Sequence, residues 1–279
     1  MDKRYLSLGI CQLMQGYDIE KNLIRAISQI DEAQARGAEV AVLPEMFLCP
    51  YEPHAIKTAI AYTHAAMDKL KACSRRHGIF IIAGSLPFEA GEKRPKNRAI
   101  VFDPKGDLIY RHDKIHLFDC SPPGGPHVKE SATISPGNSL GTFLTPWGVA
   151  SVIVCYDIRF TPLTQLLVDQ HVRLLFVPAA FSLSTGKAHW EMLLRLRAVE
   201  IQGFVVGVQP AFNDELNYVP YGHSMVAGPW GDVLLDAGDK ETVEVIRLDM
   251  LESENIQKKF PLIAHRRADL YRTVWNDGD

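Results

Sequence analysis

Short apolar runs alternate along the chain with longer stretches in which apolar residues recur every three or four positions. The runs are typical of buried strands and the longer stretches of amphipathic helices. Asp18 is placed to cap the first helix at its start, and Gly37 to end it. In order, the pattern predicts strand 6–13, helix 18–36, strand 40–43, helix 63–77, strand 79–83 and a hairpin within 98–110.

The second half of the chain repeats this order of elements. It predicts strand 149–154, helix 161–170, strand 174–177, helix 188–202, strand 204–208 and a hairpin within 225–235. Three pairs of landmark residues are each 125 positions apart, namely Gly78 and Gly203, Pro104 and Pro229, and Gly106 and Gly231. Chance recurrence of a common turn is the alternative, but the shared order favours an internal duplication.

Strands that alternate with helices indicate an α/β fold, and the hairpins require antiparallel pairing as well. We therefore predict a four-layer α-β-β-α sandwich of two mixed sheets, built from two similar halves. No linker or low-complexity boundary interrupts the chain, so residues 1–279 are expected to form a single domain. A C-terminal extension, about 251–279, lies outside the repeat.

Composition narrows the class of protein. The 279 residues are 47% hydrophobic and 23% charged, which is typical of a globular domain rather than a disordered or fibrous chain. The formal net charge of -3, without a Lys/Arg run longer than two, disfavours nucleic-acid binding. We find neither a secretory signal nor a membrane-spanning stretch. Five widely spaced cysteines without a C-x-x-C pair favour free thiols and a cytoplasmic location.

Cys155 is the cysteine that the pattern sets apart. It follows the apolar run 149–154 and precedes a helix start, so its sulfur is expected at the carboxyl edge of a sheet, where α/β folds place their sites. The helix N-terminus and Arg159 would favour a thiolate. A buried structural cysteine is the commoner fate of a lone thiol, so spacing alone leaves both interpretations open. Cys11, taken as its counterpart in the first half, is expected in the core.

Two charged residues follow predicted strands. Glu45 comes after strand 40–43, whereas the corresponding position in the second half is Ala179, so the fold itself does not require an acid there. Lys114 follows the first hairpin. A desolvated glutamate beside a thiol is suited to general base catalysis, and a lysine to stabilising an oxyanion. A surface-loop glutamate and a solvated lysine are the alternatives.

No motif indicates a metal or a cofactor. His112 and His116 lack an H-E-x-x-H context and a third ligand at useful spacing. The phosphate-binding and dinucleotide-binding glycine motifs and the G-x-S-x-G nucleophile elbow are also absent from the sequence. We therefore expect a protein that uses neither metal nor cofactor.

Three segments together resemble the signature segments of the nitrilase (carbon–nitrogen hydrolase) superfamily. They are Leu43-Pro44-Glu45, Asp113-Lys114-Ile115-His116-Leu117 and Val154-Cys155-Tyr156-Asp157-Ile158-Arg159-Phe160. The resemblance extends over essentially the whole chain and includes 186–191, 197–200, 221–224 and 266–271. The fold of this family is an α-β-β-α sandwich, in agreement with the repeat.

The resemblance implies a Glu-Lys-Cys catalytic triad. Cys155 would be the nucleophile that forms a thioester, and Glu45 the general base. Lys114 and the backbone N–H of Tyr156 would hold the oxyanion, and Glu130 would assist the triad.

Substrate-binding candidates follow from the same motifs. Arg159 and Tyr51, near Cys155 and Glu45 in sequence, are candidates for a substrate carboxylate, although a structural salt bridge is an equal possibility for Arg159. Their positions in the motifs make five further residues candidates for lining the substrate pocket, namely Tyr156, His116, Phe118, Phe181 and His189. Helical spacing assigns Trp190, Met192, Leu193 and Leu196 to the core or a subunit interface.

Within the family the chain most resembles omega-amidases, which hydrolyse the terminal amide of 2-oxoglutaramate and 2-oxosuccinamate. Two places depart from that subgroup, Lys187 in place of proline and the loop 120–127. The alternatives are an amidase for deaminated glutathione, an N-carbamoyl amidohydrolase, an acyltransferase and a non-catalytic binding protein. The resemblance also implies a homo-oligomer, for which the apolar C-terminal extension is a candidate contact.

Overall fold

The computed structural model describes residues 3–91 and 93–276. Its strands form two six-stranded sheets and a small two-stranded one. The first sheet has the order β14 (Thr242–Asp249), β1 (Tyr5–Gln12), β2 (Val40–Val42), β3 (Phe80–Phe88), β4 (Lys96–Phe102) and β5 (Leu108–Asp113). The second has the order β13 (Val233–Asp236), β12 (Met225–Ala227), β11 (Phe204–Val208), β10 (Leu174–Pro178), β9 (Gly148–Val152) and β8 (Phe143–Thr145).

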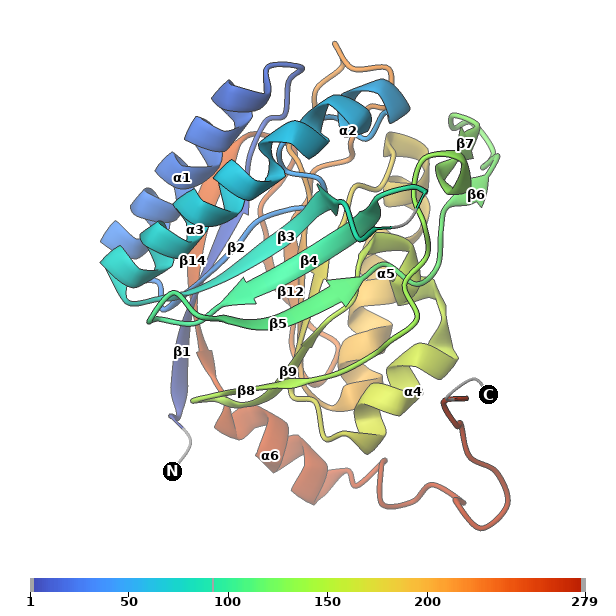
Figure 1. The fold of residues 1–279 in the computed structure, drawn as a ribbon. Helices are drawn as coiled ribbons and strands as arrows, with labels where there is room; N and C mark the ends of the chain where they lie inside the picture. Colours follow the sequence, from blue (N-terminus) through green and yellow to red (C-terminus); the bar gives the residue numbers. More distant parts are fainter. Residues whose placement is uncertain (1–2, 92, 277–279) are drawn as a thin grey trace.

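Helices cover the outer faces of the two packed sheets (Figure 1). α1 (Ile19–Ala35) and α3 (Thr63–His77) pack on the first sheet, and α5 (Leu183–Ile201) packs on the second, with α4 (Thr161–Asp169) against it. The remaining elements are α2 (Pro53–Ala59), α6 (Leu251–Lys259), the 3₁₀ turns η1 (Ile60–Tyr62), η2 (Glu130–Ala132) and η3 (Cys155–Arg159), and the short pair β6 (Asp119–Cys120) and β7 (Val128–Lys129). The four-layer α-β-β-α sandwich predicted from the sequence is confirmed.

Two apolar clusters fill the space between the four layers. Successive side chains of a strand point to opposite faces, so the strands β1 to β4 contribute to both clusters. Leu8 and Ile10 belong to the core between the sheets, together with Phe176 of the second sheet. Ala41 and Ile81 instead face the helices of the first half. Strands buried on both faces are apolar almost throughout, which is the pattern seen in the sequence.

The two halves are duplicates in topology. In each, three parallel strands are followed by two antiparallel ones, and each sheet is completed by an antiparallel edge strand, β14 or β8. Gly106 and Gly231, 125 residues apart, have the same left-handed φ, +82° and +85°. The helix ends differ, however. Gly78 is the left-handed residue that ends α3, whereas Gln202 with φ +48° takes that role after α5. Gly203 is needed for space, because a Cβ there would meet the Arg173 backbone at 2.5 Å.

Helix boundaries agree with the sequence patterns in most places. Asp18 caps α1 and accepts from the N–H of Lys21, and α3 covers 63–77 as predicted. The prediction for α5 is wrong at its start, because the helix begins at Leu183 rather than Ala188. Ser182 caps this helix by accepting from the N–H of Thr185, a signal in Ser182-Leu-Ser-Thr that the apolar periodicity does not contain.

The C-terminal extension packs against its own chain. In α6, Glu254 pairs with Arg173 at 2.9 Å, and beyond it Arg266 pairs with Asp169 of α4 at 2.5 Å. Most residues beyond α6 are exposed. Among the described residues, no helix combines the length and the hydropathy needed to cross a membrane.

Candidate active site

Glu45 lies beyond the carboxyl end of β2 and is completely buried. The turn that carries it is fixed on both sides. Gln15 donates to the carbonyls of Glu45 and Met46, at 3.3 and 2.8 Å. Met46 has a left-handed φ of +50°, and its N–H donates to Ser85 Oγ at 2.9 Å. The carboxylate is therefore held by a rigid backbone, and the surface-loop interpretation is wrong.

Cys155 begins the 3₁₀ turn η3 after β9 and has a left-handed φ of +48°. A residue with a side chain is strained in this conformation, and such strain concentrates at functional sites. The turn is supported from below by Arg197, whose buried guanidinium donates to the Ile158 carbonyl at 2.8 Å. In the register of the strands Cys155 corresponds to Leu13, so the predicted equivalence with Cys11 is wrong. Cys11 is a buried core residue, as expected.

Lys114 follows β5 and is completely buried. Its Nζ donates to Glu45 Oε1 at 3.0 Å and to the Tyr51 hydroxyl at 3.1 Å, and forms an ion pair with Glu130 Oε2 at 2.9 Å. Glu130, at the start of η2, also accepts from the N–H of Phe118 at 2.7 Å. The structure thus brings Glu45, Lys114 and Glu130 into one buried cluster.

Asn97 on β4 is a member of this cluster that the sequence analysis missed. Its Nδ2 donates to Glu45 Oε1 at 2.7 Å and to Glu130 Oε1 at 3.3 Å. Its backbone carbonyl accepts from the N–H of Lys114 at 2.9 Å. The signal in the sequence was an amide two positions before the apolar run 99–102 of a buried strand.

Burial and charge set the protonation of the cluster. Burial raises the pKa of Glu45, and Lys114 only partly opposes it. The pKa of the Cys155 thiol lies well above its ordinary value because of burial and the nearby Glu45 carboxylate. Burial alone would lower the pKa of Lys114, but Glu130 and Glu45 outweigh it and hold the pKa well above its usual range. The resting cluster therefore holds a neutral thiol and a charged lysine beside a carboxylate of raised basicity.

A small hollow opens above the Cys155 sulfur. Its volume is about 10 Å³. Of the predicted binding residues, Tyr51, Phe118, Tyr156, Arg159 and Phe181 line it. Tyr218 and Thr185 also line it and were not predicted. Tyr218 contacts Tyr51 at 5.3 Å between ring centroids and donates to the Ala180 carbonyl at 2.7 Å.

Arg159 stands at this hollow and makes no ion pair with a carboxylate within residues 3–91 and 93–276. Its guanidinium lies 4.8 Å from the Phe181 ring centre and 5.7 Å from that of Tyr156. One Nη donates to His189 Nδ1 at 3.2 Å. Its Nε is buried and has no hydrogen-bond partner among the described residues. The structural role below the nucleophile belongs to Arg197 instead, and Arg159 is left with donors for a ligand.

His116 and His189 are not among the residues that line the hollow. His116 stacks on Phe160 at 3.5 Å between ring centres, and its Nδ1 lies 2.8 Å from Asp157 Oδ1. His189 is exposed on α5 and reaches the hollow only through its 3.2 Å contact with Arg159.

Asp157, two residues after the nucleophile position, is the centre of a second buried network. Its carboxylate accepts from the N–H groups of Val154 and His116 and faces Nε2 of His112 at 3.0 Å. Burial opposes ionisation, but the hydrogen bonds from His112 and His116 outweigh it and hold the pKa of Asp157 far below its ordinary value. The two histidines are thus committed to a carboxylate.

One group of three metal-ligating side chains occurs within 3–91 and 93–276, Asp31, Cys73 and His77 between α1 and α3. His77 Nε2 lies 2.7 Å from Asp31. Arg76 donates to the same carboxylate, so a cation already occupies this position. None of its three members belongs to the Cys155 cluster.

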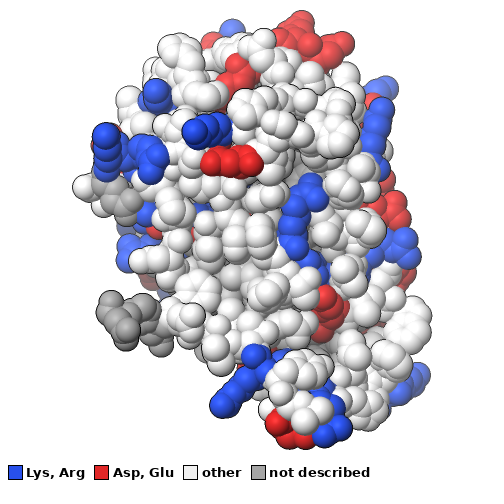
Figure 2. Space-filling model, turned by 90° about the vertical axis from the view of Figure 1, so that its right-hand side faces the viewer, with Lys and Arg blue, Asp and Glu red and all other residues white. Residues whose placement is uncertain are grey.

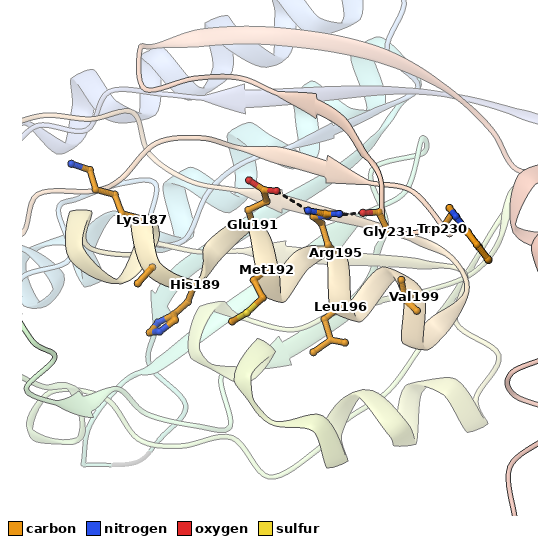
Figure 3. Close-up of a pocket in the computed structure, with 10 residues that line it drawn as sticks. Lys187, His189, Glu191, Met192, Arg195, Leu196, Val199, Trp230 and Gly231 are labelled. Atoms are coloured by element: carbon orange, nitrogen blue, oxygen red, sulfur yellow. Dashed lines mark hydrogen bonds and ion pairs between the residues drawn. The ribbon is translucent and has the colours of Figure 1, made fainter.

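A larger hollow of about 450 Å³ lies on the outer face of α5 (Figure 3). It is bordered by His189, Met192, Leu196 and Trp230 and contains none of the cluster residues. Met192, Leu196 and Trp230 are 58%, 45% and 62% exposed. Trp190 and Leu193 of the same predicted stripe are buried, so the stripe divides between core and surface.

The comparisons with known proteins agree on one family. The carbon-nitrogen hydrolase model matches residues 7–256. Omega-amidase NIT2 of Mus musculus is 40% identical over 265 residues, covering 95% of this chain and 96% of the mouse protein. The crystal structure of the C. elegans NitFhit protein has a TM-score of 0.91 at 31% identity, over 99% of this chain and 68% of the other. Saccharomyces cerevisiae Nit3, a member of branch 10 of the nitrilase superfamily, has a TM-score of 0.86 at 30% identity, over 95% and 98%.

The fold is an α-β-β-α sandwich in which Glu45, Lys114 and Cys155 follow the strands β2, β5 and β9. This arrangement is that of an enzyme with the nitrilase fold. The chain belongs to the carbon–nitrogen hydrolase family.

Proposed function

We propose that the protein is an omega-amidase, which cleaves the terminal amide of a small 2-oxo dicarboxylic acid monoamide to the 2-oxo acid and ammonia. 2-Oxoglutaramate and 2-oxosuccinamate are the substrates in question. The observation that carries the proposal is the buried cluster of Glu45, Lys114 and Cys155 next to an arginine without a carboxylate partner. The relatives named omega-amidase support it, since they match over nearly their full length.

In the acylation step, Glu45 takes the proton of the Cys155 thiol while the sulfur attacks the amide carbon. The carbonyl oxygen becomes negative and is held by Lys114 and the N–H of Tyr156, which as the second residue of η3 lacks an acceptor within that turn. Because Lys114 Nζ already faces Glu45, Glu130 and the Tyr51 hydroxyl, the oxyanion takes the place of the hydroxyl, the longest of these three contacts. The carbon–nitrogen bond then breaks as Glu45 returns its proton to the departing ammonia.

In the deacylation step, Glu45 takes a proton from water, and the oxygen attacks the thioester carbon. The carbon–sulfur bond breaks, the 2-oxo acid leaves, and the proton returns to the Cys155 sulfur. Glu130 keeps Lys114 charged and in place throughout, through its 2.9 Å ion pair. No step calls on a metal or cofactor, so a chelator is expected to leave the activity unchanged.

Arg159 holds the carboxylate at the far end of the substrate. Its guanidinium is fixed between the Phe181 and Tyr156 rings and has a buried Nε available as a donor. A charge-assisted hydrogen bond from arginine suits a carboxylate. With Arg159 in this role, the enzyme would bind 2-oxo dicarboxylic monoamides more tightly than neutral amides, which lack the second carboxylate.

Ammonia release from a panel of substrates tests the proposal. The panel holds 2-oxoglutaramate, 2-oxosuccinamate, deaminated glutathione, an N-carbamoyl amine and a neutral aliphatic amide. Preference for the first two is expected. Preference for deaminated glutathione or the carbamoyl compound would overturn the substrate. Acyl transfer to an added amine in preference to water would overturn hydrolysis, and no turnover of any member would favour a binding protein.

The protein acts in this proposal as a single cytoplasmic domain, 1–279, that forms a homo-oligomer. All five cysteines are free, which suits a reducing compartment. The exposed apolar residues of α5 and Trp230 offer a contact for a second copy (Figure 3). On the face that Figure 2 shows, basic and acidic side chains are interspersed between broad uncharged areas.

A further inference from the structure

Asn97 contacts every charged member of the buried cluster. Its side-chain amide bridges the two carboxylates, at 2.7 Å to Glu45 and 3.3 Å to Glu130, and its carbonyl holds the backbone of Lys114 at 2.9 Å. Asn97 is itself completely buried on β4.

The contacts of Asn97 make the two oxygens of Glu45 unequal. Oε1 accepts from Asn97 Nδ2 and from Lys114 Nζ, at 2.7 and 3.0 Å. Oε2 is buried and has no hydrogen-bond partner among the described residues. Because Oε1 already faces two donors, a proton that the carboxylate takes up is directed to Oε2.

We propose that Asn97 is a positioning residue that directs the proton carried by Glu45 to Oε2, the oxygen left free for the thiol, ammonia and water. The inference rests on the proposed function in so far as Glu45 is the general base. It adds a residue that sets the geometry of the proton transfers without touching the substrate.

An asparagine is suited to this role because its amide offers two hydrogens without a charge. The orientation of the amide is fixed, since turning it over would set Oδ1 against carboxylate oxygens of Glu45 and Glu130. In the observed orientation Oδ1 is buried without a hydrogen-bond partner in the described part of the chain. Leaving a buried acceptor unpaired is unfavourable, so the two donor contacts must offset it.

Substitution at Asn97 should move the titration of the cluster in a known direction. The titratable groups facing Glu45 are Lys114, Glu130, Cys155, Tyr51 and Tyr218. Asn97→Asp replaces a donor by a further carboxylate, which disfavours ionisation of both Glu45 and the thiol. Asn97→Ser removes the donor alone. Both variants should therefore need a higher pH to generate the reactive state.

The test is the rate of Cys155 alkylation by iodoacetamide against pH, followed by peptide mass mapping, together with kcat and KM for the amide substrate. For Asn97→Asp we expect the alkylation midpoint to rise by about one pH unit or more, with Asn97→Ser moving less in the same direction. A loss of about 10²-fold in kcat with little change in KM is expected for both. Gln202→Leu is the matched control, because it removes a buried amide at the far end of α5 and should lower stability alone.

An alkylation profile and a kcat that stay at the wild-type values in Asn97→Ser would overturn the inference. So would a Gln202→Leu protein whose profile shifts as much as that of the Asn97 variants. The alkylation readout needs no amide substrate. Failure of the wild type to release ammonia would therefore overturn the proposed function alone and leave the Asn97 test interpretable.

Discussion

Around Cys155, burial decides which residue carries a proton. Desolvation favours the neutral thiol, whereas Lys114 stays charged because two carboxylates face it. A neutral thiol is a weak nucleophile, so the site needs a base at the moment of attack. Glu45 is suited to that task, because its raised pKa brings it closer to the pH at which it must both take and return a proton.

Glu45→Gln tests this assignment. We expect a folded protein whose kcat falls by about 10³-fold, since the base acts in both half-reactions. Rapid-quench measurement of ammonia separates the steps. A normal burst of ammonia followed by normal turnover would contradict the role of Glu45. Glu52→Gln is the control, because Glu52 lies in the same loop but its carboxylate accepts from the Tyr17 hydroxyl instead of contacting Lys114.

Arg159→Leu tests the carboxylate subsite. KM for 2-oxoglutaramate should rise by about 10- to 100-fold, the range of a lost hydrogen bond to a charged group. Turnover of a neutral aliphatic amide should change little, because that substrate makes no such contact. Equal losses on both substrates would show that Arg159 shapes the site rather than recognising a carboxylate. Arg195→Leu, on the exposed face of α5, is the matched control.

Among the individual residues, the sequence motifs indicated those that lie within a motif. They missed those that only the folding of distant segments brings to the cluster. Glu45, Lys114, Glu130 and Cys155 were found, although the order of the motifs says nothing of distance. The pairing of distant strands and loops brings in three further residues, Asn97, Tyr218 and Asp157. The local sequence does not show which distant segments lie next to each other. Motif position also did not predict that His116 contacts Asp157 and that His189 contacts Arg159, because nearness in a motif does not fix where a side chain points.

At the level of secondary-structure elements, the Asp157 carboxylate connects the turn η3 to the segment that carries Lys114. The turn contributes the N–H of Val154, and the segment after β5 contributes His116, while His112 comes from β5 itself. One buried carboxylate thus fixes the relative position of η3 and the lysine. The periodicity of the sequence predicted both elements but not this connection between them.

Asp157→Asn should lower the free energy of unfolding by about 3 kcal/mol, because a buried charge with several donors is replaced. The folded-state pKa of Asp157 is depressed. Its stabilisation is therefore complete above the unfolded pKa of about 3.9 and is lost as the pH falls toward the folded value. Urea unfolding below about pH 4 should accordingly be steeper in pH for the wild type than for the variant.

Identical pH slopes for the wild type and Asp157→Asn would contradict this account of the network. Asp169→Asn is the control, since Asp169 makes an exposed ion pair with Arg266 and should contribute less than about 1 kcal/mol.

For the whole molecule, the duplication was the part of the fold that the sequence predicted best. Repeated landmarks predicted the layers, and both sheets confirm them. The edge strand β14 was not predicted, because it pairs with β1 from the other end of the chain. The duplication also shows why the second half cannot supply a second copy of the proposed site, since Ala179 and Leu13 occupy the positions equivalent to Glu45 and Cys155.

The exposed apolar face of α5 predicts self-association. The double variant Met192→Glu and Leu196→Glu should be monomeric in size-exclusion chromatography with light scattering, because charges would be buried at the contact. Leu144→Glu, at a leucine that is 78% exposed on β8, should keep the wild-type mass. A monomeric wild type, or a double variant of unchanged mass, would contradict the proposed contact.

Ammonia release from 2-oxoglutaramate by the wild type, Cys155→Ala and Cys11→Ala tests the covalent mechanism. Cys11 is a matched control, because it is a fully buried cysteine in the core. Turnover is expected from the wild type and from Cys11→Ala, and none above background from a folded Cys155→Ala. Steady-state release of ammonia by Cys155→Ala would contradict the covalent mechanism.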